Sequence, residues 1–256
     1  MKIYSWNVNG IRSAWGKGLS NFFHQYDPDI LCLQEIKANA SQFPDEIRED
    51  SLFNKKTHYL YTCCAVKPGY AGVAVLSKEK PLGVITELGH DRFDSEGRML
   101  RLDFSDFSLF NFYIPHGGRQ KENLNYKLEV NDLILRKLRS LKGRKLILVG
   151  DFNIAHDERD LDRPKQNINN IMFTLEERQV LDNLISLGFI DTLREFKSEG
   201  GLYSWWPYMA GARERNLGWR IDYGFISNNL RDKLKDGFTC PEIRGSDHGP
   251  IGLELF

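Results

Sequence analysis

The sequence predicts an α/β (α+β) fold in which β-sheets pack face to face and helices cover their outer surfaces. Two observations point to this class. Short apolar runs of strand length recur along the whole chain, and segments with the apolar period of a helix are few and lie between them. Strand-rich segments interrupted by isolated helices are typical of packed sheets with helices outside.

The predicted strands are of two kinds. Apolar runs without polar interruption indicate strands that are buried on both faces, and they are DILCL (29–33), GVAVL (72–76) and KLILVG (145–150). Two further segments, RMLRLDF (98–104) and SLFNFYIP (108–115), are separated only by residues 105–107. Such a short connection predicts an antiparallel hairpin.

Two helices and a short third are expected. In residues 123–142 one apolar stripe is formed by leucines spaced four, seven and three apart, at Leu124, Leu128, Leu135 and Leu138. The second helix begins in TLEER, where Thr174 and Glu177 have the spacing of a capping box, and it ends at Gly188. The segment PDEIRED (44–50) is expected to add the short helix.

The bulk composition is that of an ordinary globular protein. The chain has 256 residues, 41% of them hydrophobic, with no repeat and no linker, so we expect one domain over residues 1–256. Lys plus Arg and Asp plus Glu number 35 each, so any nucleic-acid surface must be a local basic patch. No signal peptide, zinc-type cysteine spacing or apolar stretch of ~20 residues is present. These features indicate an intracellular protein.

Polar side chains collect where the predicted strands end. If the sheets pack face to face, these ends converge on one edge and gather Asn7, Glu35, Asp151, Asn153, Asp222, Asp247 and His248. Each residue alone is more typical of a solvated turn. Five apolar strands that all adjoin Asp, Glu, Asn or His are not explained by turn chemistry, so the set predicts a site.

Oxygen donors without a Cys/His cluster suit magnesium, or manganese, and disfavour zinc. Magnesium in proteins commonly binds substrate phosphate oxygens as well. Because the chain lacks a GxxxxGK[ST] loop, nucleotide-driven phosphoryl transfer is disfavoured. The sequence therefore predicts metal-assisted hydrolysis of a phosphate ester.

The chain resembles the exonuclease III family of apurinic/apyrimidinic endonucleases, within the endonuclease/exonuclease/phosphatase superfamily. The likeness spans the chain through SWNVNGIR, PDILCLQEIK, GYAGVAVLSK, YIPHGG, GDFNIAH, FTLEER, GWRIDY and GSDHGPI. It implies a four-layered sandwich, as in deoxyribonuclease I-like proteins, with two mixed sheets between helical layers. It also implies a DNA-repair nuclease that cuts 5′ to abasic sites and leaves a 3′-hydroxyl and a 5′-deoxyribose phosphate. Removal of nucleotides or blocking groups from 3′ ends is implied as well.

The resemblance also assigns roles. Asp151 would orient or deprotonate the attacking water, steadied by Asn153. His248, held by Asp222, would bind the scissile phosphate together with Tyr113 and Asn7. The implied metal residues are Glu35, Asn7 and Asp247, with Asp151, Asn153 and His248 beside a second ion.

The implied substrate is duplex DNA bound by a monomer. The resemblance makes Trp205 and Trp219 walls of a pocket for a base-free sugar. The other implied DNA contacts are Arg12, Lys17, Lys37, Tyr70, His116, Arg119, Asn167, Asn170 and Met209. Two residues depart from the common family pattern: Asn9 replaces a metal-side Asp, and His116 replaces an Asn that contacts the phosphate.

Two alternatives stay open at this point. A superfamily member could act on a phosphoinositide or sphingolipid head group, although the aromatic and basic loop 205–219 argues against it. A non-catalytic DNA-binding scaffold is the other alternative, and the complete set of strand-end residues disfavours it.

Overall fold

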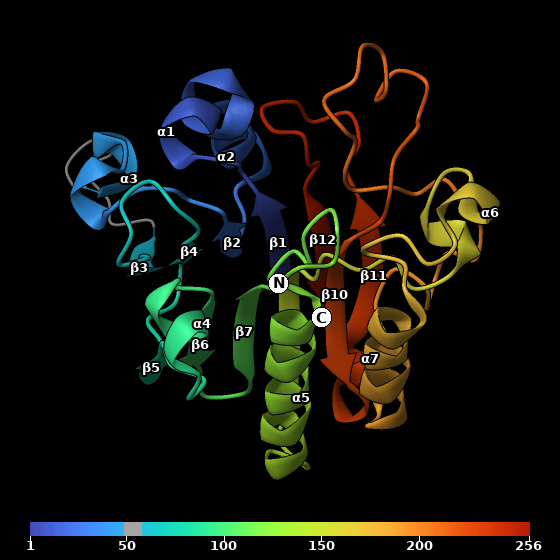
Figure 1. Cartoon of the computed structure of the whole chain (residues 1–256). Coiled ribbons are helices and arrows are strands. Elements are labelled where there is room, and N and C mark those ends of the chain that lie inside the picture. The colour runs from blue at the N-terminus through green and yellow to red at the C-terminus, as the bar shows by residue number, and fades with distance from the viewer. Residues whose placement is uncertain (49–57) are drawn as a thin grey trace.

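Figure 1 shows a computed structural model of the chain, which describes residues 1–48 and 58–256. Within these residues the strands form two six-stranded sheets. The first has the order β11-β12-β1-β2-β4-β3, and the second β5-β6-β7-β8-β10-β9. The strands of the first sheet are β1 (Lys2–Asn7), β2 (Ile30–Gln34), β3 (Tyr59–Cys63), β4 (Val73–Ser77), β11 (Leu234–Thr239) and β12 (Ile251–Leu255). Those of the second are β5 (Gly83–Ile85), β6 (Met99–Asp103), β7 (Ser108–Tyr113), β8 (Leu146–Asp151), β9 (Phe189–Asp191) and β10 (Asp222–Ser227).

Both sheets are mixed. β1 and β2 run parallel, as do β7 and β8, and the other neighbouring pairs are antiparallel. The three predicted two-face-buried strands are β2, β4 and β8, and every residue of each is buried. The predicted hairpin is β6–β7, closed by a 2.8 Å hydrogen bond from Phe104 N to Phe107 O.

Three layers of apolar side chains hold the sandwich together. Alternate residues of each strand point to opposite faces, so in β1 Ile3 enters the layer between the sheets and Tyr4 enters the layer outside them. The inner layer also contains Cys32, Val75 and Ile147. Burial on both faces explains why β2, β4 and β8 carry no polar alternation. It also confirms the predicted architecture.

Helices cover the outer faces (Figure 1). The α-helices are α1 (Ile11–Ala14), α2 (Ser20–Tyr26), α3 (Asp45–Arg48), α4 (Asp91–Ser95), α5 (Leu124–Ser140), α6 (Pro164–Asn167) and α7 (Leu175–Ser186). A π-helical turn at Trp15–Leu19 joins α1 to α2, and 3₁₀ turns lie at Ala40–Gln42, Glu158–Asp160 and Asn228–Lys233. The predicted helix at 44–50 is present as α3, and residues 49 and 50 lie outside the described residues. In the described parts of the chain, no helix has both the length and the apolar character needed to cross a bilayer.

The helix α7 confirms its predicted start. The Thr174 hydroxyl accepts a hydrogen bond from Glu177 N, and the Glu177 carboxylate accepts one from Thr174 N, which completes the capping box. At its other end Gly188 has φ 94°, a left-handed conformation that favours glycine.

The predicted leucine stripe of α5 is wrong in part. Leu135 and Leu138 are buried, but Leu124 and Leu128 are only half-buried. Polar residues occupy buried positions beside the apolar face instead. The buried residues of α5 are Tyr126, Lys127, Val130, Asn131, Ile134, Leu135 and Leu138. A hydrophobic period cannot reveal a face that includes lysine and asparagine, because it registers apolar residues only, whereas these two are buried through hydrogen bonds.

A pair of buried amides joins the two sheets through the otherwise apolar inner layer. Gln34 Nε2, at the end of β2, donates to Asn111 Oδ1 of β7 at 2.6 Å. The Asn111 amide donates in return to the carbonyls of Leu33 and Ala74. These bonds connect β7 of one sheet to β2 and β4 of the other.

Candidate active site

The predicted strand ends converge on one edge of the sandwich. In the second sheet the register places Tyr113 and Asp222 beside Asp151 on the two strands that flank β8. Asn7 reaches across from the first sheet, and its Nδ2 donates to Asp151 Oδ2 at 2.9 Å. A cavity of about 260 Å³ opens here, lined by Asn7, Asn9, Glu35, Lys37, Tyr113, His116, Asp151, Asn153, Met172, Trp205, Ile221, Asp247 and His248.

Asp151 is held by hydrogen-bond donors on both carboxylate oxygens. Oδ1 accepts from Asn153 N at 2.8 Å, and Oδ2 accepts from the amides of Asn7 and Asn153 at 2.9 and 3.3 Å. The side chain is buried, and burial together with the neighbouring Asp222 carboxylate raises the pKa of Asp151 to about 7. The carboxylate is therefore fixed in one orientation at the floor of the cavity.

The backbone around Asp151 is shaped for this placement. Gly150 has φ 139°, and a Cβ atom there would lie 1.9 Å from the carbonyl oxygen of Phe112. Only glycine fits such a close approach between neighbouring strands. Asn153 follows in the left-handed region with φ 52°, which directs its amide back to Asp151.

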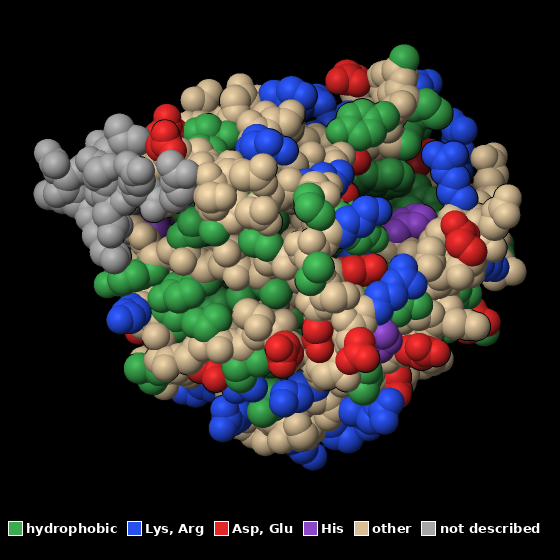
Figure 2. Space-filling view, turned by 60° about the vertical axis from the view of Figure 1, so that its left-hand side comes forward, with side chains coloured by type: hydrophobic (Ala, Val, Ile, Leu, Met, Phe, Trp, Pro, Cys, Tyr) green, Lys and Arg blue, Asp and Glu red, His purple; other side chains and the backbone are tan. Residues whose placement is uncertain are grey.

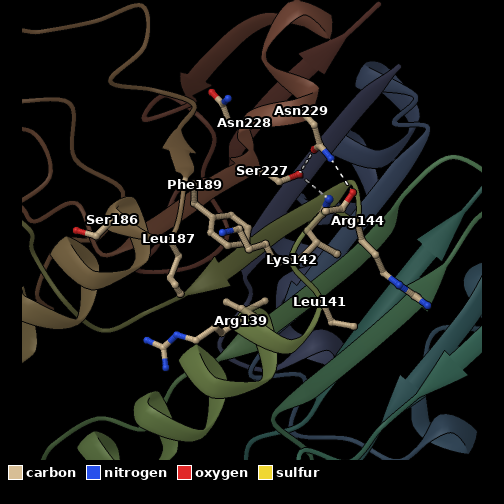
Figure 3. Close-up of a pocket in the computed structure, with 14 residues that line it drawn as sticks. Arg139, Leu141, Lys142, Arg144, Ser186, Leu187, Phe189, Ser227, Asn228 and Asn229 are labelled. Atoms are coloured by element: carbon tan, nitrogen blue, oxygen red, sulfur yellow. Dashed lines mark hydrogen bonds between the residues drawn. The ribbon is translucent and has the colours of Figure 1, made fainter.

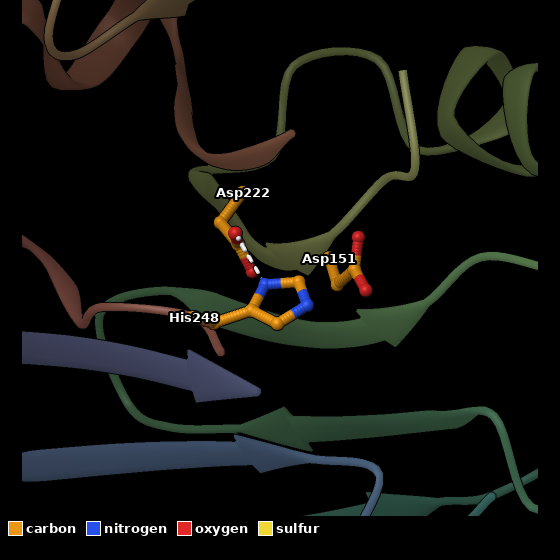
Figure 4. Close-up of side chains that lie close together, drawn as sticks. All are labelled: Asp151, Asp222 and His248. Carbon is orange, nitrogen blue, oxygen red and sulfur yellow. Dashed lines mark hydrogen bonds and ion pairs between the residues drawn. The ribbon is translucent and has the colours of Figure 1, made fainter. Parts of the chain in front are cut away.

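His248 and Asp222 form a buried pair. The Nδ1 atom of His248 lies 2.9 Å from Asp222 Oδ2, which also accepts a 2.6 Å hydrogen bond from Ser204 Oγ. Figure 4 shows that the other nitrogen of the imidazole faces Asp151. Burial disfavours the charged imidazole, but the Asp222 carboxylate overcomes this and raises the pKa of His248 to about 10. Both ring nitrogens therefore carry protons at neutral pH, and Nε2–H is available to a ligand.

On the other side of the cavity, Asp247 is surrounded by donors. Its Oδ1 accepts from Asn9 Nδ2 at 3.0 Å and its Oδ2 from Trp205 Nε1 at 3.1 Å. Glu35 follows the end of β2, and its Oε1 lies 3.0 Å from Lys37 Nζ. Asn9, the residue that departs from the pattern implied by the resemblance, thus donates to Asp247. An aspartate at position 9 would instead repel the Asp247 carboxylate.

Two further groups supply hydrogen-bond donors. Burial and the nearby Glu35 carboxylate raise the pKa of Tyr113 well above its ordinary value, so its phenol keeps its proton. His116 accepts from Gly118 N at its Nδ1, and desolvation together with the Lys127 charge lowers its pKa. A neutral imidazole with Nδ1 as acceptor carries its proton on Nε2. His116 therefore offers an N–H at Nε2.

The donor set fits a hard divalent cation. The cavity presents carboxylate oxygens from Glu35, Asp151 and Asp247 and amide groups from Asn7 and Asn153, which is the ligand chemistry of magnesium. Asp151, Asp222 and His248 also place one N or O atom each within 4.8 Å of the others, but an imidazole that carries a proton on both nitrogens has no lone pair for a metal. Asp222 was not among the residues expected near a metal. Its Oδ2 already binds His248 and Ser204, and its Oδ1 is buried and has no hydrogen-bond partner among residues 1–48 and 58–256.

The predicted DNA contacts lie around the cavity at different distances from it. Lys37 and His116 line it. Lys37 also borders a second cavity of about 400 Å³, together with Arg12 and Gly69. The exposed side chains are those of Arg12, Lys17, His116, Arg119, Asn170 and Met209. Tyr70 and Asn167 are half-buried, and Tyr70 accepts a hydrogen bond from Arg98. Figure 2 shows Lys and Arg side chains around a hollow in which hydrophobic and histidine side chains are exposed.

The two predicted wall residues are direct neighbours. Trp205 and Trp219 exchange backbone hydrogen bonds of 2.9 and 2.8 Å, and a bridge connects Trp205 to His248. Trp205 lines the cavity. Trp219 is half-buried, beside Phe173 at a ring separation of 6.5 Å, and is not among the lining residues.

Sequence reasoning missed the residues that support the site from behind. Ser204 holds Asp222, and Arg220 is buried between Asp160 and Asp191 with contacts of 2.7 Å to each, next to Trp219. Arg220 lies inside the motif GWRIDY. Its position between the predicted site residues Trp219 and Asp222 was the available signal, but its two carboxylate partners are 60 and 29 residues away in the chain.

A larger cavity, of about 420 Å³, lies at the opposite end of β8 (Figure 3). It is lined by the ends of α5 and α7 and by residues 227–229, and none of its lining residues is a carboxylate or a histidine. β8 begins at this cavity and ends at Asp151, and of the two cavities only the smaller one is lined by groups capable of acid–base or metal chemistry.

Comparison with known proteins agrees with this geometry. The chain matches the Endonuclease/Exonuclease/phosphatase family over residues 4–248. It is 40% identical to an exodeoxyribonuclease of Bacillus subtilis (strain 168), over 99% of this chain and 98% of that protein. It is 38% identical to a DNA-(apurinic or apyrimidinic site) endonuclease of Dictyostelium discoideum, over 99% of this chain and 70% of that protein.

A solved structure has the same fold over the whole chain. The 3′ phosphatase NExo from Neisseria, bound to a product DNA hairpin, has a TM-score of 0.89 at 30% identity and covers 100% of this chain and 99% of its own. The four-layered sandwich and the family resemblance read from the sequence are therefore confirmed. The chain belongs to the Endonuclease/Exonuclease/phosphatase family, and its relatives there are exodeoxyribonucleases and apurinic or apyrimidinic site endonucleases.

Proposed function

We propose that this protein is a magnesium-dependent DNA-repair nuclease, formed by a single catalytic domain over residues 1–256. It hydrolyses the phosphodiester 5′ to an abasic site in duplex DNA and leaves a 3′-hydroxyl and a 5′-deoxyribose phosphate. It also removes nucleotides and blocking groups from 3′ ends. The names of its relatives, which include an exodeoxyribonuclease, an abasic-site endonuclease and a 3′ phosphatase, support both activities.

The observation that carries the proposal is the position of Asp151 opposite a set of proton donors. In-line hydrolysis of a phosphodiester requires an oriented water on one side and stabilisation of charge on the phosphate oxygens. Asp151, fixed by donors on both oxygens, is the acceptor for the water. The protonated His248 and the Tyr113 phenol are donors to the nonbridging oxygens.

Glu35 and Asp247, with Asn7 beside them, would hold the magnesium ion, and manganese has the same ligand preferences. When bound, such an ion supplies a Lewis acid that stabilises negative charge on phosphate oxygens. The protein itself orients the reacting groups. Asn7 and Asn153 hold the base Asp151, Asp222 holds His248, and Trp205 holds Asp247.

The proposal is tested with a duplex that carries one abasic site, incubated with and without EDTA. We expect a single nick 5′ to the lesion, with a 3′-hydroxyl and a 5′-deoxyribose phosphate at the new ends, and no nick with EDTA. A nick of other polarity, or cleavage of phosphoinositide in place of DNA, would contradict the proposal. DNA binding without cleavage would indicate a scaffold instead.

Replacing Glu35 with glutamine is expected to weaken the metal site first. At limiting magnesium, cleavage should fall by at least ~10-fold, because an amide is a poorer ligand than a carboxylate, and raised magnesium should restore part of the activity. The measurement is the initial rate against magnesium concentration. Glu87→Gln, at an exposed position, is the matched control. A variant whose loss is the same at every magnesium concentration would remove Glu35 from the metal site.

Replacing Trp205 with serine is expected to relax the choice of lesion. The indole lines the cavity, and a normal nucleotide must be unstacked and needs room for its base. Cleavage at damaged-base nucleotides relative to abasic sites should rise about tenfold, the size of one aromatic contact. Trp205→Phe keeps an aromatic ring but loses the N–H that binds Asp247. It therefore distinguishes the effect of the aromatic wall from that of the hydrogen bond. An unchanged ratio in a serine variant with the parent Tm would refute the wall role.

A further inference from the structure

A charged side chain that the proposed mechanism does not use lies buried behind the catalytic cavity. Lys127 of α5 has no solvent exposure, and its Nζ donates to Glu177 Oε1 of α7 at 2.5 Å. Glu177 is equally buried. A buried ion pair costs desolvation free energy, and apolar residues of similar volume often stabilise a protein as well or better. The pair therefore needs an explanation beyond the packing of α5 against α7.

The second contact of Lys127 is with the catalytic loop. Its Nζ donates to the backbone carbonyl oxygen of Asn153 at 2.6 Å. Within residues 1–48 and 58–256, no backbone N–H donates to that carbonyl. The lysine thus satisfies a buried acceptor that the strand β8 leaves unpaired when it ends at Asp151.

Asn153 is the residue whose conformation matters most in this loop. It adopts φ 52°, in the left-handed region, which is uncommon for non-glycine residues although asparagine tolerates it better than most. The N–H and the side-chain amide of Asn153 both bind Asp151, and the amide also binds Ile114 O. A change in the backbone of Asn153 would therefore move the donors that orient Asp151.

Glu177 fixes Lys127 in turn. Its second oxygen, Oε2, accepts hydrogen bonds from Thr174 N and Thr174 Oγ1 at 3.1 and 3.0 Å, as part of the capping box that starts α7. One carboxylate thus anchors both the helix terminus and the lysine. The chain of contacts runs from α7 through Glu177 and Lys127 to Asn153 and Asp151.

We propose that Lys127, held by Glu177, is a positioning residue that fixes the left-handed conformation of Asn153 and through it the orientation of Asp151. This inference rests on the proposed nuclease function for its kinetic consequence. Lys127 does not line the cavity, so it acts on turnover and not on the binding of DNA.

The test replaces both members of the pair. Lys127→Met alone would leave the Glu177 carboxylate buried without a counter-charge and is expected to unfold the protein. In K127M/E177Q both charges are absent, and the glutamine oxygen still accepts from Thr174. The matched control is K137M/E176Q, which makes the same chemical changes at exposed positions of α5 and α7.

With abasic duplex as substrate, we expect kcat of K127M/E177Q to fall ~10- to 100-fold, the size typical of lost outer-shell support. KM should stay near that of the control, and thermal unfolding should show that the variant, although less stable because the Asn153 carbonyl loses its donor, is folded at the assay temperature. In an N153A background the same double change should cost less than it does in the parent, because one of the two Asp151 donors that Lys127 positions, the Asn153 side-chain amide, is already absent. Parent kcat in folded K127M/E177Q, or the same loss in both backgrounds, would overturn the proposal.

A crystal structure of K127M/E177Q gives a readout that does not depend on activity. Departure of Asn153 from the left-handed region supports the positioning role, and an unmoved Asn153 overturns it. Failure of the parent protein to cleave abasic DNA would count against the proposed function alone, since the conformation of Asn153 is measured separately.

Discussion

Replacing Asp151 with asparagine is expected to reduce kcat by at least ~100-fold, the size typical of lost general-base assistance, while DNA affinity stays near that of the parent. The physical reason is twofold. An amide does not accept the proton of the attacking water. In the parent protein, N–H donors of Asn7 and Asn153 bind both oxygens of Asp151. In the variant, the new NH₂ group faces some of these donors. Single-turnover cleavage and a separate binding titration measure the two quantities.

The control for this variant is Asp132→Asn, the same change on the exposed face of α5. Thermal unfolding of both variants separates lost chemistry from lost structure, because donor-to-donor contacts at a buried site also destabilise the fold. A D151N protein that turns over at the parent rate with saturating substrate would remove Asp151 from the mechanism.

The second large effect concerns His248 and Asp222, which should act as one unit. Each of H248A and D222N is expected to lower kcat about 100-fold, and the double variant should lose about the same, not the product of the two losses. Asp222 holds Nδ1 of the imidazole at 2.9 Å and stabilises its charge, so the histidine without Asp222 no longer presents a fixed Nε2–H. The double-mutant cycle is measured at saturating substrate.

A second Asp–His pair provides the control for that cycle. His156 and Asp182 are in contact at 2.8 Å on a more exposed part of the surface, so H156A/D182N makes the same changes away from the cavity. That variant should keep the parent kcat. Multiplicative losses in the H248A/D222N cycle would show that the two residues work separately.

The fold could be predicted where the residues of a strand alone indicate how the strand is buried. The apolar runs at 29–33, 72–76 and 145–150 are strands buried on both faces, and their short length favours strands over buried helices. The stripe of α5 was predicted only in part, since Lys127 and Asn131 lie on its buried face. The buried partners of Lys127, Glu177 and Asn153, are distant in the sequence, and Asn131 donates to the Lys127 carbonyl of its own helix.

The candidate site was predictable as a set but not as a geometry. Polar residues after apolar strands indicated which side chains meet, and the cavity contains Asn7, Glu35, Asp151 and His248 together. The hydrogen bonds that orient them could not be predicted, because they depend on the strand register and on left-handed residues such as Asn153. The tautomer of His116 could not be predicted either, because it depends on the hydrogen bond that Gly118 N donates to its Nδ1.

The amides of Gln34 and Asn111 bear on catalysis although neither touches the cavity. Hydrophobic contact has no preferred direction, so apolar packing specifies the offset of two sheets less sharply than hydrogen bonds do. The hydrogen bonds of Asn111 to Leu33 and Ala74 and that of Gln34 to Asn111 are directional and are satisfied at one offset of the sheets. That same offset brings Asn7 of the first sheet within 2.9 Å of Asp151 of the second. Alignment of the reacting groups is thus set inside the dry interior, so substitutions there can change turnover without contact with DNA.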